Sequence, residues 1–356
     1  MDLKILKTQN PKAKPMNENE LGFGRIFTDH MFIMEYTEGI GWHDARIQPY
    51  QNLALDPAAM VLHYGQAIFE GLKAYRNPAD KIQLFRPMDN MARFNRSAAR
   101  LCIPDIDEAF VLDALKQLIA LDIDWVPKSP GTSLYIRPTG VSSDPFLGVR
   151  VSNNYLFYIL LSPVGNYYAE GLKPVKILVE NQYVRAVRGG MGYAKAAGNY
   201  ACSLIADATA KKHGCAQVLW LDGVERRYVE EVGSMNIFFK IDGELITPPL
   251  EGSILGGITR DSIIQLARKK GMAVSERRLA IEDIIAAQQS GKLEEIFGTG
   301  TAAVISPVGS LVYGEDTYQV ADGQMGAAAL DLYDTLTGIQ TGRLPDDMGW
   351  ILPLSE

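Results

Sequence analysis

The chain contains 356 residues, of which 47% are hydrophobic and 22% are charged. This is the composition of a globular protein, and it excludes the low-complexity, fibrous and disordered classes. Lys and Arg total 35 against 42 Asp and Glu, so the net charge is −7, which argues against nucleic acid and anionic membrane surfaces as partners. At roughly 150 residues per domain, the length predicts two domains.

Cysteine usage and hydropathy predict a cytoplasmic protein. Cys102, Cys202 and Cys215 are widely spaced and form no C-x-x-C pair, which is typical of reduced thiols rather than of a disulfide framework or a zinc knuckle. The longest apolar run, 155–161, is far shorter than the roughly 20 residues of a membrane span. The lysine-containing N-terminus is followed by no apolar h-region, so we expect neither a signal peptide nor a transit peptide.

The first half of the chain predicts a mixture of short strands and amphipathic helices. The expected elements are a polar arm over 1–20, strands within 60–86 around a turn at 77–80, helices over 88–101 and 107–121, and strands over 132–141 and 154–164. Pro87 suits the first position of its helix. The strand over 154–164 is apolar on both faces, which predicts a fully buried strand.

Residues 165–174 combine Gly, Pro and polar side chains and predict an interdomain linker. We therefore expect a smaller N-terminal domain over 1–164 and a larger C-terminal domain over 175–356. In the latter, the expected elements are strands over 175–184, 216–221, 226–230, 235–241 and 244–247, helices over 199–212, 259–270 and 281–289, a strand between the last two helices, and strands over 294–298 and 302–306. This order predicts an α+β protein rather than a doubly wound βαβ sheet.

Several common motifs are absent from the sequence. There is no P-loop, zincin or nucleophile-elbow pattern, and no His or Cys cluster has the spacing of metal ligands, so we predict no metal site. The segment 298–303 fits G-x-G-x-x-A, but the sequence after it is β-rich, whereas a dinucleotide site needs a helix there. A nicotinamide-dependent dehydrogenase is therefore a disfavoured alternative. The same turn still offers backbone N–H groups to an anion.

The most informative segment is GGMGYAKAAGNY over 189–200, in which small residues surround Lys195. A lysine is ordinarily a solvated surface charge. Here the small neighbours let the backbone approach a ligand closely, and a lysine shielded from water can form a Schiff base. Schiff-base formation by lysine is the chemistry of enzymes that use pyridoxal 5′-phosphate, so we predict that cofactor and Lys195 as its reacting amine.

Such a cofactor needs a carboxylate for its ring nitrogen and an anion site for its phosphate. The pair Glu230-Glu231 ends a predicted strand, and the alternative interpretation is a solvated sheet edge. Thr259 lies where a helix begins, and a helix N-terminus binds anions, although the threonine could simply cap the helix. Arg93 is a candidate phosphate ligand, while Arg96 and Arg100 on the same helical face are interpreted as a solvated stripe.

In these features the chain resembles the branched-chain amino-acid aminotransferases, which have the two-domain pyridoxal-phosphate fold type IV shared with D-amino-acid aminotransferase. The resemblance is carried by FGRIFTDHMF (23–32), HYGQAIFEGLKAYR (63–76), LFRPMDNMARFNRSAARL (84–101), SLYIRP (133–138), RAVRGGMGYAKAAGNY (185–200), EVGSMNIFF (231–239), GGITRDSI (256–263) and FGTGTAAVISPVG (297–309). It implies an α/β N-terminal domain and a β-barrel-like α/β C-terminal domain that binds the cofactor.

The resemblance also implies a role for each matching residue. Lys195 would be the catalytic amine, bound to the cofactor and, once released, moving a proton between the substrate Cα and the cofactor. The implied cofactor contacts are Arg93, Arg185, Lys195, Tyr200, Glu231, Ile258, Thr259 and Thr301. The implied substrate contacts are Phe23, Tyr64, Phe69, Tyr135, Arg137, Tyr167, Thr301 and Ala302. Among them, Arg137 would receive the distal carboxylate of glutamate or 2-oxoglutarate, and Tyr64 would come from the second subunit of a homodimer.

Two positions depart from the family pattern. Ala303 and Ser306 stand where some members have a redox-active C-x-x-C, so we expect no thiol switch there, and Ser234 replaces a common threonine. The implied reaction moves the amino group of Leu, Ile or Val to 2-oxoglutarate. A D-amino-acid aminotransferase or an aminodeoxychorismate lyase is the alternative, because both would share the lysine and the glutamate but need other pocket walls.

Overall fold

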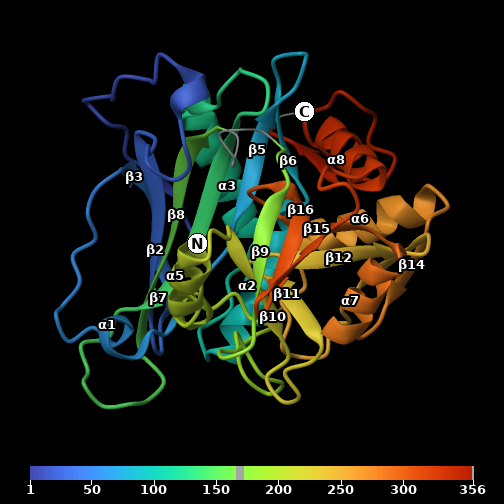
Figure 1. Cartoon of the computed structure of the whole chain (residues 1–356). Coiled ribbons are helices and arrows are strands. Elements are labelled where there is room, and N and C mark those ends of the chain that lie inside the picture. Colours follow the sequence, from blue (N-terminus) through green and yellow to red (C-terminus); the bar gives the residue numbers. More distant parts are fainter. Residues whose placement is uncertain (166–171, 355–356) are drawn as a thin grey trace. The chain divides into compact units, whose positions relative to one another are not determined.

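The computed structural model describes residues 1–165 and 172–354, so most of the predicted linker over 165–174 lies outside the described residues. The chain divides into two compact units (Figure 1). Among the described residues, the first unit holds 1–165, 194–198 and 339–354, and the second holds 172–193 and 199–338. The two later segments make the first unit the larger one, whereas we expected a smaller N-terminal domain.

The first unit is built on a sheet with strand order β1-β3-β2-β8-β7-β5-β6-β18, and β4 pairs with β7. Its strands are β1 (Lys4–Ile5), β2 (His30–Thr37), β3 (Gly41–Pro49), β4 (Ala67–Phe69), β5 (Leu72–Arg76), β6 (Ile82–Phe85), β7 (Ser133–Ser142), β8 (Asn154–Val164) and β18 (Ile351–Pro353). Its helices are η1 (Glu18–Glu20), α1 (Met60–Tyr64), α2 (Pro87–Arg100), α3 (Glu108–Leu121) and η2 (Ile123–Trp125). Figure 1 shows β2, β8 and β7 side by side in this sheet.

Several predictions for this half are confirmed. Strand β8 has the predicted bounds, and α2 begins at Pro87 as expected for proline at the first helical position. The antiparallel pair β5–β6 confirms the hairpin around 77–80. The prediction that β8 is buried on both faces is wrong, because buried residues alternate with half-buried ones such as Tyr158 along most of the strand.

Two other predictions are corrected in the same unit. The first residues of the stretch 60–86 form α1 rather than a strand, and α1 ends at Gly65, whose positive φ of 62° is typical of a helix C-terminus. The arm over 1–20 is not purely irregular, since β1 pairs in parallel with β3. Farther along the arm, the Lys12 N–H donates to Asp29 at 2.7 Å. The Asp29 carboxylate, just before β2, therefore helps to order a segment whose polar composition predicts neither a helix nor a strand.

The second unit has the sheet order β11-β10-β9-β16-β15-β12-β13-β14, and β17 pairs with β16. Its strands are β9 (Val175–Glu180), β10 (Gln217–Leu221), β11 (Val229–Val232), β12 (Asn236–Ile241), β13 (Glu244–Thr247), β14 (Ala273–Glu276), β15 (Leu293–Gly300), β16 (Val304–Tyr313) and β17 (Asp316–Gln319). The helices are α4 (Ala197–Ala201), α5 (Leu204–Lys212), α6 (Ile258–Lys269), α7 (Ile281–Gln289) and α8 (Ala327–Gln340), of which α4 and α8 cross a unit boundary in the sequence. Parallel and antiparallel pairs mix in this sheet, which confirms the α+β prediction.

Predicted and observed elements of this unit agree best at β13 and α7, which have the predicted bounds. The predicted helix over 199–212 is broken into α4 and α5. The predicted strand over 226–230 begins later, as β11, because Asp222 holds the preceding turn by accepting backbone hydrogen bonds from residues 224, 225, 227 and 228. The elements β17, α8 and β18 are not predicted from the sequence.

The hairpin β15–β16 decides between two interpretations of residues 298–303. The two strands are antiparallel, and Gly300 pairs with Val304, so a strand rather than a helix follows the glycine-rich turn. A dinucleotide fingerprint needs a helix there, so the dehydrogenase alternative is excluded at this segment. Within the described part of the chain, no helix combines the length and apolar character needed to cross a bilayer.

Candidate active site

The segment around Lys195 is held by backbone hydrogen bonds in the first unit. The Lys195 N–H donates to Ser97 Oγ on α2 at 2.9 Å, and its carbonyl accepts from the Phe69 N–H at 3.1 Å. Ala196 forms an isolated antiparallel bridge with Ile68. The half-buried side chain places its amine 5.0 Å from the centroid of the Phe69 ring. The backbone on both sides of the lysine is therefore fixed to β4 and α2, which limits where the amine can reach.

Four of the predicted substrate residues lie together in the first unit. The Arg137 guanidinium lies 4.6 Å from the centroid of Phe69 and 5.2 Å from that of Tyr135, and its Nη2 donates to the Tyr135 hydroxyl at 2.9 Å. Phe23 packs edge-on against Tyr135, with 4.8 Å between the two ring centroids. Arg137 Nε is buried and has no hydrogen-bond partner among the described residues. This arrangement provides aromatic walls with one cation whose donor can still bind an acceptor.

Gly71 gives Tyr135 the space that this arrangement needs. A Cβ at position 71 would overlap the Tyr135 hydroxyl. A larger residue would therefore displace the tyrosine and, with it, the hydroxyl that accepts from Arg137.

Arg93 has an unpredicted partner, Glu70. Its Nε and Nη2 donate to the two carboxylate oxygens of Glu70 at 2.7 and 2.8 Å, and both side chains are buried. Burial favours a raised pKa for Glu70, but the Arg93 charge and its hydrogen bonds outweigh burial and hold that pKa below its ordinary value. The sequence offered one signal for this pair, namely that Glu70 lies within the largely apolar run 67–75. A charge buried in such a run requires a partner.

Lys73 is a second residue that the sequence interpretation missed. It lies on β5 opposite Tyr135 on β7, so the two side chains share one face of the sheet. Burial lowers its pKa to about 8. The face that carries Tyr135 therefore also carries an amine that loses its proton as the pH rises through about 8.

One described residue of the predicted substrate set in the first unit, Tyr64, is not brought into this group. Tyr64 ends the exposed helix α1, and its hydroxyl donates to the carbonyl of Leu147 instead. Tyr167 lies outside the described residues.

In the second unit, Glu231 and Arg185 face each other. Arg185 Nε lies 3.2 Å from Glu231 Oε2 without an aligned hydrogen bond, and both side chains are buried. Glu231 Oε1 accepts from the Leu255 N–H at 2.9 Å. Arg185 Nη2 also donates to the carbonyls of Ser253 and Gly192. The carboxylate thus has an arginine beside it and a backbone donor that ties it to the loop before α6.

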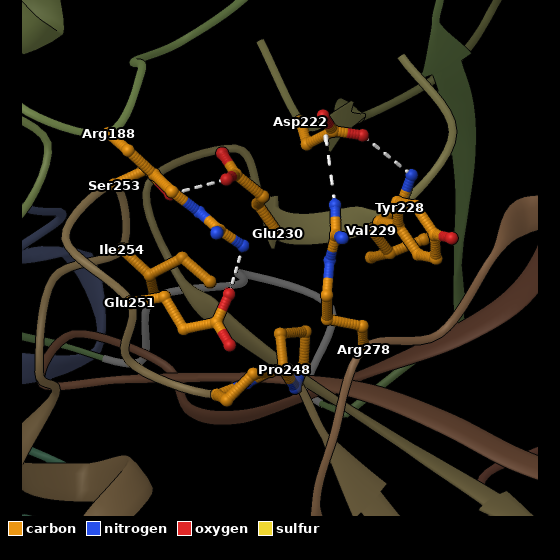
Figure 2. Close-up of a pocket in the computed structure, with 11 residues that line it drawn as sticks. Arg188, Asp222, Tyr228, Val229, Glu230, Pro248, Glu251, Ser253, Ile254 and Arg278 are labelled. Carbon is orange, nitrogen blue, oxygen red and sulfur yellow. Dashed lines mark hydrogen bonds and ion pairs between the residues drawn. The ribbon is translucent and has the colours of Figure 1, made fainter. Parts of the chain in front are cut away.

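The neighbouring Glu230 has a different environment, which Figure 2 shows. It lines a cavity of about 20 Å³ together with Ser253, whose hydroxyl donates to it, and with Arg188, Asp222 and other residues of this unit. Such a cavity holds about one water molecule and is too small for a cofactor. Burial raises the pKa of Glu230 despite the hydrogen bond from Ser253. Since adjacent strand residues face opposite ways, Glu231 and not Glu230 is the acid beside Arg185.

Helix α6 begins at Ile258, with Thr259 buried in its first turn. Gly257 precedes the helix, and the helix start has no side-chain cap, so Thr259 does not cap it. The first N–H groups of an α-helix have no acceptor within the helix and attract anions. A Cβ on Gly257 would overlap Asn236 Oδ1, so the close approach of these two loops requires glycine.

The turn that carries Thr301 and Ala302 is linked to the start of α6 through Asn236. The Asn236 side chain donates to the Leu255 carbonyl at 2.8 Å, and the same residue pairs with Thr299 across β12 and β15. Thr299 Oγ1 is buried without a hydrogen-bond partner in the described chain. Tyr200 is half-buried on α4. These loops place backbone donors and one orphaned hydroxyl near the helix terminus.

Comparison with known proteins identifies the family. The sequence model of the family described as "Amino-transferase class IV" matches residues 67–311. Branched-chain-amino-acid aminotransferase 2 of Bacillus subtilis (strain 168) is 58% identical over 98% of this chain and 95% of its own length. Two thirds of the chain thus carries the family pattern, and the chain belongs to the class IV aminotransferases, whose cofactor is pyridoxal 5′-phosphate.

Solved structures agree with this assignment. The branched-chain amino acid aminotransferase of Escherichia coli superposes with a TM-score of 0.76 at 29% identity, covering 92% of this chain and 99% of that one. The branched-chain aminotransferase of the thermophilic archaeon Thermoproteus uzoniensis, solved with norvaline, superposes with a TM-score of 0.76 at 27% identity, covering 91% and 99%. The predicted type IV aminotransferase fold is therefore confirmed.

Proposed function

We propose that this chain transfers amino groups between the branched-chain L-amino acids Leu, Ile and Val and 2-oxoglutarate, giving branched 2-oxo acids and L-glutamate. The similarity to branched-chain aminotransferases over nearly the whole chain supports the reaction and the substrate class. The observation that carries the proposal in the structure is the group of Lys195, Phe69, Tyr135 and Arg137, which combines a reactive amine, an apolar wall and a cation.

The described residues fit pyridoxal 5′-phosphate as a cofactor. Lys195 supplies an amine on a fixed backbone, and Glu231 supplies a buried acid. The start of α6 and the orphaned hydroxyl of Thr299 supply donors suited to a phosphate. When bound, the cofactor supplies a carbonyl carbon to which the amino group is transferred, and a ring that withdraws electrons from the substrate.

Within this proposal, each residue has a defined task. Lys195 attaches the cofactor and then, as a free amine, takes the proton from the substrate Cα and returns one on the cofactor side. Glu231, which lies beside Arg185, holds a proton on the ring nitrogen. Arg93, Ile258, Thr259 and Thr301 bind the phosphate, Arg185 lines the cofactor, and Tyr200 donates to its phenolic oxygen.

The substrate groups must accept both an apolar side chain and a carboxylate. Phe23, Phe69 and Tyr135 provide aromatic surface for Leu, Ile and Val. Arg137 Nε can donate to the distal carboxylate of glutamate, and the N–H groups of Thr301 and Ala302 bind the α-carboxylate. Discrimination among the three branched substrates is weak, since one methylene is worth about 1–3 kcal/mol.

We further propose a cytoplasmic homodimer in which Tyr64 completes the partner's pocket. Exposed apolar side chains occur on α1 and on the loop between β7 and β8, where the Leu147 carbonyl accepts from the Tyr64 hydroxyl, and they comprise Leu62, Tyr64, Leu147, Val149 and Val151. A contiguous exposed apolar patch typically marks a protein interface. The three cysteines are free, as expected in a reducing compartment. Val149→Asp should convert the dimer to a monomer in light scattering, and an unchanged mass would contradict this interface.

The decisive experiment is the absorption spectrum of the purified protein before and after L-leucine. The proposal predicts a yellow protein whose visible band shifts on addition of L-leucine, is restored by 2-oxoglutarate and disappears after borohydride treatment. A panel of amino donors separates the alternatives within the fold. If D-alanine outpaces L-leucine with 2-oxoglutarate, the substrate assignment is wrong and a D-amino-acid aminotransferase is favoured, while pyruvate formation from aminodeoxychorismate would indicate the lyase.

A further inference from the structure

Glu70 lies between Phe69 and Gly71 at the end of β4, and its side chain is fully buried. A carboxylate in such a place is costly unless it is paired and hydrogen-bonded. The residue has no part in the roles described above, so its presence between two site residues needs a physical explanation.

The contacts of Glu70 reach α2 through two side chains. Oε1 accepts from Arg93 Nε at 2.7 Å, while Oε2 accepts from Arg93 Nη2 at 2.8 Å and from Asn90 Nδ2 at 2.8 Å. The Gly71 N–H also donates to Oε2 at 3.2 Å. This two-pronged pairing fixes the plane of the guanidinium as well as its position.

The same carboxylate is electrostatically coupled to Lys195. Phe69, the residue before Glu70, bonds to the Lys195 carbonyl and lies under the Lys195 amine. Burial favours a raised pKa for Glu70, but the charge and hydrogen bonds of Arg93, followed by the charge of Lys195, hold that pKa below its ordinary value.

A second cation lies at the same ring. The Arg137 guanidinium and the Lys195 amine lie 4.6 and 5.0 Å from the centroid of the Phe69 ring. Glu70, the next residue in the chain, pairs with the Arg93 guanidinium on α2.

We propose that Glu70 is a positioning residue of the cofactor site, which holds the Arg93 guanidinium in the orientation that binds the cofactor phosphate. The proposal rests on the proposed function, because it assumes that Arg93 binds that phosphate. A purely structural ion pair would hold α2 to β4 without affecting the preference for a phosphorylated ligand.

Glu70→Gln tests this with almost no change of shape. The carboxamide keeps one oxygen but turns an NH₂ group toward donors on Arg93, Asn90 or Gly71, so the two-pronged pairing is lost. It also removes the negative charge, leaving Arg93 and Lys195 without their shared counterion. Glu180→Gln is the matched control, since Glu180 is a buried carboxylate of the second unit that accepts from the N–H groups of residues 182 and 183.

The readout is the preference for pyridoxal 5′-phosphate over pyridoxal, measured as the ratio of their dissociation constants in the cofactor-free full chain. Both ligands carry the same aldehyde and ring, so the ratio reports on the phosphate contacts. Glu180→Gln should leave the ratio unchanged.

A misdirected Arg93 should reduce this preference by roughly tenfold in Glu70→Gln. A folded Glu70→Gln protein with the native preference for the phosphorylated form overturns the proposal.

Folding of the variants is checked by circular dichroism and melting temperature. If Glu70→Gln does not fold, the same comparison is made between Arg93→Gln and Arg93→Gln/Glu70→Gln, where no buried cation is left unpaired. Because Glu70 acts through Arg93, the preference should be reduced equally in these two variants, and a further loss in the double variant overturns the proposal. If the native chain itself neither binds pyridoxal 5′-phosphate nor transaminates L-leucine, it is the proposed function that fails.

Discussion

Glu70 in the first unit and Glu231 in the second are both buried acids, but they are held in different ways. In the first unit, Glu70 accepts from side chains, with Arg93 and Asn90 on α2 bonded to its oxygens at 2.7–2.8 Å. In the second, Glu231 accepts from the Leu255 backbone, and the arginine beside it, Arg185, is not aligned for a hydrogen bond through Nε. The first acid is locked by its own partners, whereas the second is attached to a loop.

This difference separates two kinds of site residue. An acid locked by side chains acts through the groups that it fixes, so its replacement should change the reactivity of its neighbours. An acid held by the backbone can be exchanged for its amide with little structural change, and the exchange then reports on the chemistry of its charge. The predictions below test this contrast, and the largest expected effect comes first.

The first test concerns Lys195, whose charge is one of those that lower the pKa of Glu70. Lys195→Ala removes the group that attaches the cofactor, so we expect turnover with L-leucine to fall by about 10⁴-fold or more. Steady-state kinetics with 2-oxoglutarate measures this. Lys211→Ala, at an exposed position of α5, is the control and should be fully active. Normal transamination by Lys195→Ala would remove the lysine assignment.

Glu231 and Glu230 provide a matched pair for the second unit. Glu231→Gln should still bind the cofactor but lose about 10²–10³-fold in kcat, because a neutral amide no longer stabilises charge on the ring nitrogen. Glu230→Gln should have little effect, since burial already raises the pKa of Glu230 toward its neutral form. Spectroscopic titration and kcat measurements test both variants, and equal losses would mean that the two acids are not distinguished as described.

The cation of the first unit should affect one half-reaction more than the other. Arg137→Met keeps an apolar wall but removes the donor for the distal carboxylate, so KM for 2-oxoglutarate should rise roughly 10–100-fold while KM for a branched 2-oxo acid changes little. Arg277→Met, which removes a surface ion pair with Glu244, serves as the control. A parallel rise for both acceptors would instead indicate damage to the whole pocket.

Asp222 tests the backbone-held acids by stability rather than by activity. Burial favours a raised pKa, but hydrogen bonds from four backbone N–H groups outweigh it and hold the pKa at about 2, against an ordinary 3.8. The ionised form therefore stabilises the folded chain above the ordinary value, and this contribution is lost as the pH falls through about 2.

Asp222→Asn should therefore cost about 1–2 kcal/mol at neutral pH, and the difference from the native chain should shrink from about pH 4 downward. Melting temperatures over a pH series measure the difference. A gap between the two proteins that does not depend on pH would contradict the assigned pKa.

The parts of the fold that the sequence predicted have strong local signals. Proline at the start of α2, the Asp-Gly turn before β13 and the apolar length of β8 each depend on residues close in sequence. The missed or misassigned parts depend on distant ones. Helix α1 has five residues, too few to display a helical period, and β18 is a strand because it pairs with β6.

The site follows the same rule. The small residues around Lys195 and the family pattern pointed to the lysine and to Glu231 without a structure. The partnership of Glu70 with Arg93 links positions in different elements, and the segment 194–198 joins the first unit through Ile68, Phe69 and Ser97. Such pairings leave only a weak trace in sequence, namely a charged residue within an apolar run.

The pairing of β18 with β6 has a consequence for biosynthesis of the chain. Residues 82–85 are buried, and the ribosome makes them well before their strand neighbour at 351–353. Until that neighbour is made, the growing chain presents an apolar strand with unpaired backbone groups, which is the kind of edge that recruits other chains. Residues 351–353 therefore cover that edge, and a nascent chain that stops before them should be a client for chaperones rather than a shorter enzyme.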